Sequence, residues 1–420
     1  MEKRIRTILF LICVILFFII SGTLILYTQG YRFDFKNKKF TRIGGLFLKT
    51  FPKQVNVYLD DKFVKKTDFI FGSTLIENLL PKKYKIRVEK EGYFSWEKNL
   101  EIKENNVTEA RYIILFPKKL NFEILFNDIK NFWISLEGKK MIFLEIREKE
   151  KFLSLYDTER KTKKTLIEME GDNFELSNLW FSKDERTIYL KIESEEGEKS
   201  FSLNLEETKP RLIEFTEEKL PFENVTFLKT EKEIYYLTSL GVIYQTDPDL
   251  RFKTQINNNP FPVKKEEEYK LEIFGDWIFL KEGGKFFYFN RESDIFEKVQ
   301  EGVLDYKVSK DDGKLAIFSN AEIWVFFLKD KITPPIKQRG EKIFITRFSE
   351  KIGDLFWLNS DYLIFSVGNK IKVCEIDDRD KMNIYDLEEF EKPKIFFSES
   401  EKSLYILSKD GIFLLSLPMP

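Results

Sequence analysis

Few of the side chains that carry out common catalytic chemistry occur in this sequence. Its 420 residues include no histidine and two cysteines, Cys13 and Cys374. The lack of histidine excludes Ser-His-Asp and Cys-His nucleophile systems and His-ligated zinc or haem. Two cysteines cannot form a four-cysteine zinc site or a disulfide framework. Carboxylates are therefore the main candidates for acid–base or metal chemistry.

The spacing of the 70 Asp and Glu residues selects no site. Asp377-Asp378-Arg379-Asp380 and Asp247-Pro248-Asp249 resemble fragments of calcium loops, but neither has the D-x-[DN]-x-[DN]-G spacing, so we interpret both as turns. Glycosidases use two carboxylates about 5–9.5 Å apart, and a chain this rich in acids offers such pairs by chance. We predict no catalytic, metal-binding or cofactor-binding residue, and the ligand-binding residues stay unassigned.

Charge is distributed unevenly along the chain. Residues 1–43 carry eight Lys/Arg against two Asp/Glu, and residues 44–117 carry thirteen against ten. Because the whole chain has a net charge of −1, residues 118–420 have a net charge of −10. A nucleic-acid-binding surface needs a basic face, so we predict no nucleic acid partner for the large C-terminal part.

An uncharged stretch near the N-terminus predicts a membrane-spanning helix. No charged residue occurs from Thr7 to Tyr31, and the apolar core covers 8–27. As a helix, that core spans about 30 Å, the thickness of the bilayer hydrocarbon. It exceeds the roughly 7–15 residues of a signal-peptide core, and no A-x-A-like cleavage site follows it. We therefore predict an uncleaved anchor, with a cleaved signal peptide as the alternative.

The flanking charges leave the orientation of this helix less constrained. Lys3, Arg4 and Arg6 precede it, but Arg32 and Arg42 are among five cations that follow it. Long domains translocate largely regardless of charge, so we predict that 1–7 is a short cytoplasmic tail, 28–43 a juxtamembrane linker, and the remainder extracytoplasmic. The reversed topology is the alternative.

Residues 44–117 predict a small β domain. Val55, Val57 and Leu59 alternate with polar residues, as expected for a half-buried strand. The same alternation occurs over 84–88, further strand positions include Leu100 and Ile102, and a last strand is predicted over 112–116.

This region resembles the PEGA domain, a small β-sandwich common in bacterial envelope proteins. Of the four residues that name the family only Pro52 is kept, and Lys82 replaces a turn glycine. We interpret Tyr58, Tyr93 and Trp96 as packing residues, with a binding role as the alternative. It rests on the following positions: Pro52, 55–62, 78–81, Tyr84, 91–93, Trp96 and 115–117.

From residue 118 onward, a polar turn followed by two apolar strands recurs. Ser309-Lys310-Asp311-Asp312-Gly313-Lys314 precedes the strand 315–318, and 182–187 precedes 188–190 in the same way. One landmark aromatic recurs about every 44 residues, the period of a four-stranded propeller blade, which gives about seven blades over 118–420, with six or eight also compatible. These landmarks are Trp133, Trp180, Phe227, Trp277, Tyr306, Trp357 and Phe397.

The composition of the strands fits blades that pack back to back. Runs such as 141–144, 286–289 and 324–328 are apolar on both faces, as strands between two sheets must be. The Ser-x-Asp-x-Gly-Lys turn at 309–314 resembles the WD-repeat-like blades of TolB and its relatives. Ring closure is predicted through pairing of 120–126 with 404–415.

Together these features predict an all-β protein, with one transmembrane helix, a PEGA-like β-sandwich and a β-propeller. The function that we expect is a non-enzymatic, membrane-anchored binding or scaffold protein of the bacterial cell envelope, which recognises protein or glycan through the propeller. A propeller glycosidase or lyase that uses channel carboxylates is one alternative. A sensor ectodomain that signals through a membrane partner is another. The oligomeric state is not predicted.

Overall fold

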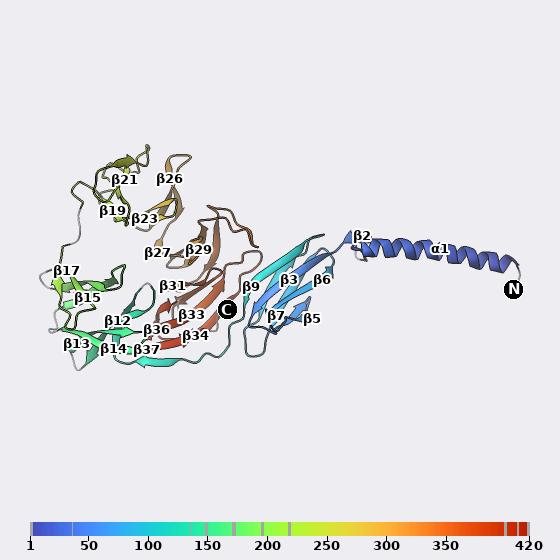
Figure 1. Cartoon of the computed structure of the whole chain (residues 1–420), viewed down its shortest axis with the longest axis horizontal. Coiled ribbons are helices and arrows are strands. Elements are labelled where there is room, and N and C mark those ends of the chain that lie inside the picture. Colours follow the sequence, from blue (N-terminus) through green and yellow to red (C-terminus); the bar gives the residue numbers. More distant parts are fainter. Residues whose placement is uncertain are drawn as a thin grey trace.

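The computed structural model describes residues 3–35, 37–135, 137–147, 150–169, 174–194, 197–216, 220–398, 401–409 and 411–417. Met1 and Glu2 of the predicted tail, and 418–420 of the predicted propeller, lie outside these residues. One helix, α1 (Lys3–Thr28), projects from one end of the molecule, a small β-sandwich follows, and a large array of sheets forms the other end (Figure 1).

Helix α1 is the predicted apolar helix. Its segment Ile5–Thr28 is long and apolar enough to cross a membrane, and none of it is buried within the protein. The helix ends where Gly30 takes a φ of +84°, a conformation that suits glycine. A short hairpin of β1 (Tyr31–Asp34) and β2 (Lys39–Arg42) follows directly.

The small domain is a sandwich of a three-stranded and a four-stranded sheet. Strand order is β6-β3-β9 in one sheet and β5-β4-β7-β8 in the other. The strands are β3 (Gly44–Phe51), β4 (Asn56–Leu59), β5 (Lys62–Lys66), β6 (Ser73–Leu79), β7 (Lys83–Glu89), β8 (Trp96–Glu101) and β9 (Val107–Ile114).

The predicted alternation in this domain is confirmed. Val55, Val57 and Leu59 are buried, as are the apolar residues of β7. The predicted last strand over 112–116 is wrong in its bounds, because β9 pairs in parallel with β3 and the pairing begins at Val107.

The chain from Glu123 to Ser416 forms seven four-stranded antiparallel sheets among the described residues, which we number 1 to 7. Sheet 1 is β11 (Ile129–Ile134), β12 (Lys140–Arg147), β13 (Glu150–Asp157) and β14 (Thr162–Met169). Sheet 2 is β15 (Phe174–Phe181), β16 (Thr187–Ser194), β17 (Gly197–Asn204) and β18 (Ile213–Glu214). Sheet 3 is β19 (Thr226–Lys229), β20 (Ile234–Leu237), β21 (Ile243–Thr246) and β22 (Lys253–Gln255).

Sheet 4 is β23 (Tyr269–Phe274), β24 (Trp277–Glu282), β25 (Lys285–Asn290) and β26 (Ile295–Gln300). Sheet 5 is β27 (Val303–Val308), β28 (Lys314–Ser319), β29 (Glu322–Phe327) and β30 (Lys342–Arg347). Sheet 6 is β31 (Ile352–Asn359), β32 (Tyr362–Val367), β33 (Lys370–Glu375) and β34 (Ile384–Glu389). Sheet 7 is β35 (Lys394–Ser398), β36 (Ser403–Ser408), β37 (Gly411–Ser416) and, at its edge, β10 (Glu123–Phe126).

The closure that we predicted between the two ends of the array is confirmed. Strand β10 pairs with β37, with Glu123 opposite Leu414 and Ile124 opposite Phe413. The ring of Phe126 then stacks on that of Phe143 in sheet 1, with the centroids 4.7 Å apart. One early strand therefore completes the last sheet, the arrangement expected of a β-propeller.

The turns that begin the repeats are held by side chains. In sheet 5, Asp311 accepts hydrogen bonds from the amide of Gly313 (3.0 Å) and from Lys314 Nζ (2.9 Å). Burial opposes ionisation of this carboxyl, but hydrogen bonds from Ser309 and Lys314 hold the pKa of Asp311 below its ordinary value. The Ser-x-Asp-x-Gly-Lys pattern is thus a self-capped turn.

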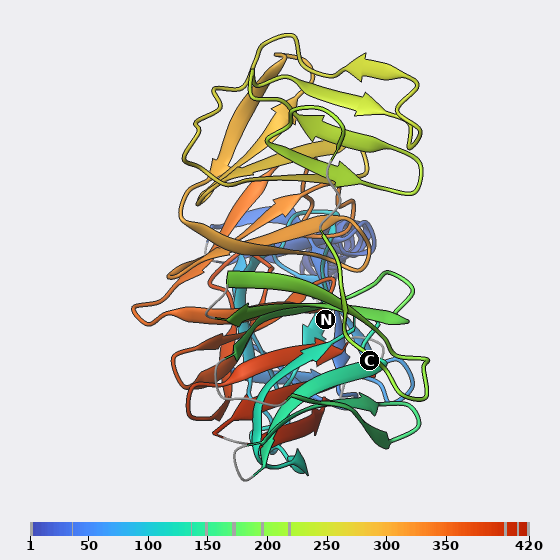
Figure 2. The same ribbon diagram turned by 90° about the vertical axis from the view of Figure 1, so that its left-hand side faces the viewer.

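Apolar clusters join neighbouring sheets at six junctions. The middle strands β28, β32 and β36 are buried on both faces, as the doubly apolar sequences predict. Among the described residues, no such cluster joins sheets 2 and 3, which also stand apart in both views (Figures 1 and 2). The prediction that neighbouring sheets pack back to back is therefore wrong for sheets 2 and 3.

The rings beside this junction pack within their own sheet. Trp180 stacks on Tyr189 in sheet 2, and Tyr236 stacks on Tyr244 in sheet 3. The strands are also short here, since β18 has two residues and β22 has three. Less apolar surface is left to bury between the sheets, and an exposed ion pair between Lys183 and Glu231 links their turns.

Candidate functional site

The first strands of six sheets surround a central cavity of about 930 Å³. The contributing strands are β11, β15, β23, β27, β31 and β35, each at the edge of its own sheet. Because each sheet begins at the centre and runs outward, one short segment per repeat reaches the cavity. Among the described residues, sheet 3 contributes no lining residue.

Aromatic side chains dominate the wall of this central cavity. Trp133, Trp180, Phe274, Phe356 and Phe396 line it and are partly or fully exposed. The rings of Phe356 and Phe396 meet edge to face, with centroids 5.2 Å apart. Large rings left accessible in a concave site provide apolar faces on which a ligand can stack, at a gain of about 0.5–1.5 kcal/mol per ring pair beyond area burial.

Two charged residues, Asp354 of sheet 6 and Lys394 of sheet 7, lie in the wall of the central cavity. Asp354 Oδ2 accepts the amide hydrogen of Ile395 at 2.9 Å. Lys394 Nζ donates to Asn131 Oδ1 at 2.6 Å and to the carbonyl of Phe132 at 3.0 Å. Burial raises the pKa of Asp354 and lowers the pKa of Lys394, and the charge of each partly opposes the shift of the other.

Further polar groups come from sheets 4 and 5. Lys307 lines the cavity and pairs with Asp305 at 2.7 Å, and its carbonyl accepts the indole hydrogen of Trp357 at 2.7 Å. Burial and then the nearby Glu272 carboxylate raise the pKa of Tyr306. The cavity therefore combines aromatic faces with two carboxylates, Glu272 and Asp354, and with three lysines, Lys183, Lys307 and Lys394.

The acidic run 377–380 does not lie at this cavity but between the sandwich and sheet 6. Asp377 binds Arg379, Asp378 binds Lys337, and Asp380 accepts the amide of Asn99 at 2.7 Å. Burial alone would raise the pKa of Asp377, but the hydrogen bond from Arg379 and the charge of Lys98 lower it below its ordinary value.

Asp247 and Asp249 both pair with Arg251 in a surface turn, at 3.3 Å in the case of Asp247. Within the described residues, no three of His, Cys, Asp and Glu are placed to hold a metal ion. Cys374 is buried in β33, where burial raises its thiol pKa, and Cys13 is exposed on α1.

A buried polar network fixes the sandwich to sheet 6. Lys98 Nζ pairs with Glu375 Oε1 at 2.8 Å, with the lysine side chain 0% and the glutamate side chain 5% exposed. Trp96 Nε1 donates to Glu375 Oε2 at 2.8 Å, and Asn383 Nδ2 donates to Oε1 at 2.7 Å. The amide of Ile114 donates to the Tyr362 hydroxyl at 3.0 Å.

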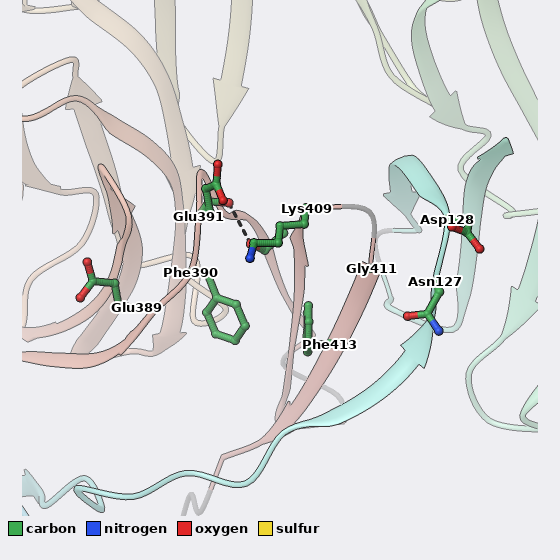
Figure 3. A pocket seen from close by; sticks show the side chains of 9 residues that line it. Asn127, Asp128, Glu389, Phe390, Glu391, Lys409, Gly411 and Phe413 are labelled. Atoms are coloured by element: carbon green, nitrogen blue, oxygen red, sulfur yellow. Dashed lines mark hydrogen bonds between the residues drawn. The ribbon is translucent and has the colours of Figure 1, made fainter.

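A second cavity, of about 570 Å³, lies at the rim between sheets 6 and 7 (Figure 3). Phe390 and Phe413 form its apolar part, and Glu389, Glu391 and Lys409 surround them. This second cavity is smaller than the central cavity. Two segments that line it are joined by a hydrogen bond from the Ser408 hydroxyl to the carbonyl of Glu391, at 2.8 Å. We therefore take the central cavity as the candidate functional site.

Comparison with known protein families supports one part of this description. The PEGA domain family matches residues 43–114, the β-sandwich between the helix and the seven sheets. The resemblance predicted from the motif residues is therefore confirmed. No curated protein matches the chain.

Solved structures similar to this chain include β-propellers. The β-propeller domain of Cps50 (Swd1) from Myceliophteria thermophila is 10% identical over 69% of this chain and 99% of that chain, with a TM-score of 0.42. YCF48 from Cyanidioschyzon merolae is 13% identical over 71% and 98%, with a TM-score of 0.40. A chain of the mitotic checkpoint complex is 10% identical over 71% and 94%, with a TM-score of 0.44. The propeller fold of this chain follows from its own strand order and from the pairing of β10 with β37.

Sequence reasoning did not identify the charged residues of the cavity. Asp354 and Lys394 lie on first strands, three residues before Trp357 and Phe397, two of the landmark aromatics of the repeat. Six of the seven landmark aromatics are on first strands, but Trp277 is on β24, the second strand of sheet 4. The landmark aromatics therefore locate five of the six cavity-lining strands, β11, β15, β27, β31 and β35, although they do not say which side chains face inward.

Proposed function

We propose that this protein is a membrane-anchored extracytoplasmic binding or scaffold protein of the bacterial cell envelope. In this proposal, 1–7 is a cytoplasmic tail, 8–27 the anchor and 28–43 the juxtamembrane segment. The PEGA domain over 44–117 holds the propeller over 118–420 away from the membrane. The ligand, a protein or a glycan, binds in the central cavity.

The observation that carries this proposal is the aromatic wall of the central cavity. About 930 Å³ is within the range of ligand-binding sites, about 300–1,000 Å³. Trp133 and Phe356 present apolar ring surface, and Lys394 and Asp354 supply polar groups that would orient a ligand. The apolar N-terminal helix supports the membrane attachment.

Binding is tested with the full chain in detergent on a glycan array and by crosslinking to envelope extracts. Ligands found in this way should lose at least about tenfold in affinity to the Trp133→Ala variant, because one lost stacking contact and its buried area amount to more than about 1.4 kcal/mol. A Phe252→Ala variant is the matched control, since Phe252 is 73% exposed and does not line the cavity. Equal loss in both variants would contradict the cavity as the binding site.

Protease treatment of intact cells tests the orientation. We expect cleavage within the surface turns of the propeller, and complete protection, lost only on cell lysis, would contradict the extracytoplasmic assignment.

One observation favours a second candidate, a glycosidase or lyase. Glu272 and Asp354 both line the cavity, from sheets 4 and 6, and a raised carboxyl pKa is a property of general acids. This candidate predicts release of reducing sugar from envelope polysaccharide, abolished in Asp354→Asn. No release by the wild-type chain would eliminate it.

A further inference from the structure

The hairpin of β1 and β2 is fixed to the C-terminal end of α1. Arg32 Nη1 donates to the carbonyl of Tyr27 at 2.9 Å, and its guanidinium lies 3.4 Å from the centre of the Tyr27 ring. The same side chain donates to Asn78 Oδ1 in the sandwich at 3.0 Å. One arginine thus joins the last turn of the helix, the hairpin and the PEGA domain.

One face of this hairpin is apolar and exposed, whereas the other is polar and buried. Cross-strand partners share a face, and Phe33 is opposite Phe40, whereas Asp34 is opposite Lys39 and Arg32 is opposite Thr41. The face with Asp34 and Thr41 is the buried one, at 7% and 3% exposure. The apolar face is therefore the one turned away from the protein.

Three phenylalanine rings occupy this outer face. Phe33, Phe35 and Phe40 are 38%, 83% and 50% exposed. Their rings contact each other edge to face, with centroids 5.1 and 5.2 Å apart. A contiguous exposed aromatic cluster is costly in water, so its position implies a partner that removes it from water.

Cations flank the same cluster. Arg42 is opposite Tyr31 on the face of Phe33 and Phe40, Lys38 lies in the turn, and both are exposed. The acid in the described part of the hairpin, Asp34, is buried on the other face and accepts a hydrogen bond from Asn37 at 2.7 Å. Aromatic rings flanked by cations, next to the end of an apolar helix, have the composition of a membrane–water interface segment.

We propose that the β1–β2 hairpin lies on the membrane surface, with Phe33, Phe35 and Phe40 inserted among the lipids and Lys38 and Arg42 on anionic headgroups. This proposal rests on the proposed membrane attachment by α1. Because the hairpin and the sandwich share the Arg32 contacts, insertion would hold the PEGA domain at a defined angle to the membrane, instead of leaving it to swing on a flexible linker.

The test measures the depth of a spin label in the full chain, reconstituted in nanodiscs of phosphatidylcholine with or without phosphatidylglycerol. Single cysteines are introduced in a Cys13→Ser background, while Cys374 is left because it is buried. Phe35→Cys reports the hairpin. Phe69→Cys is the matched control, 68% exposed on the PEGA domain, and Ile15→Cys reports the helix.

We expect the label at Phe35→Cys to be several-fold more accessible to oxygen than to a water-soluble nickel complex, relative to the label at Phe69→Cys. Phosphatidylglycerol should increase this ratio, and the combined Lys38→Gln and Arg42→Gln changes should remove the increase.

A water-exposed label at Phe35→Cys, together with a lipid-exposed label at Ile15→Cys, would overturn the hairpin proposal and leave the anchor standing. A water-exposed label at Ile15→Cys would overturn the anchor itself. If the label at Phe35→Cys is protected from both reagents, protein instead of lipid covers the rings, which also overturns the proposal.

Discussion

The buried ion pair between Lys98 and Glu375 should decide whether the PEGA domain stays docked on the propeller. Replacing Lys98 with methionine keeps the length of the side chain but leaves the Glu375 carboxylate in a site that is 5% exposed, without its cation. Its other partners, the indole of Trp96 and the amide groups of Asn383, are neutral donors. Breaking one partner of a buried pair typically costs about 3–5 kcal/mol, so we expect Lys98→Met to lose that much unfolding free energy.

A second substitution, Glu375→Gln, removes the carboxylate charge that Lys98→Met leaves unpaired. In the Lys98→Met/Glu375→Gln double variant, neither residue of the buried pair carries a charge, but one amide oxygen replaces two carboxylate oxygens that both accept hydrogen bonds. One buried donor therefore loses its partner, at a cost of about 1–3 kcal/mol. We expect the double variant to be more stable than Lys98→Met alone.

The assay is urea unfolding of the full chain in detergent, followed by tryptophan fluorescence, with hydrogen exchange of residues 94–97 and 107–116 as the local readout. Loss of docking should expose the Ile114 amide, which donates to Tyr362 across the interface. Lys62→Met is the control, because Lys62 is exposed on β5, and surface changes are usually within about 0.5 kcal/mol. A Lys98→Met variant as stable as this control, or a double variant less stable than Lys98→Met, would refute the reasoning.

Three further predictions concern the turns and the closure. Asp311→Asn should lower the unfolding free energy at neutral pH by about 1 kcal/mol, a value reduced for partial exposure. Because the pKa of Asp311 is lower in the folded than in the unfolded state, this contribution is present above its ordinary pKa, and urea titrations of variant and wild type should converge below about pH 4. Phe126→Ala should cost about 2–4 kcal/mol and raise hydrogen exchange in β37, since its ring holds the closing strand against sheet 1; unchanged exchange would contradict that role. Gly241→Ala should lower the thermal midpoint more than Gly92→Ala: both have φ of +81°, but a Cβ at 241 would lie 1.8 Å from the carbonyl oxygen of Phe261, and at 92 it meets nothing within 4 Å. Equal shifts would refute the steric explanation.

The repeat pattern shows where sequence reasoning on this fold reaches its limit. The repeat spacing predicts Trp277 as the landmark of its blade, but Trp277 lies on the second strand, where its indole donates to the carbonyl of Leu328 at 2.8 Å. In sheet 4, a turn of two residues, Gly275-Asp276, joins the first two strands. Trp277, at the start of the second strand, therefore falls at the sequence spacing expected of a landmark aromatic on a first strand. Spacing alone cannot separate a first-strand ring from a ring on the next strand that lies a few residues away.

The sequence by itself determined the apolar helix, the alternating strands of the PEGA domain and the doubly apolar strands of the sheets, because these patterns follow from local periodicity and burial. It also determined the self-capped turn at 309–314, whose partners are all within five residues. Only the tertiary structure decided that Asp377 and Asp380 contact the PEGA domain and that Asp354 and Lys394 both line the cavity. These groups act through partners that are tens to hundreds of residues distant, and such pairing depends on how the sheets close around their centre.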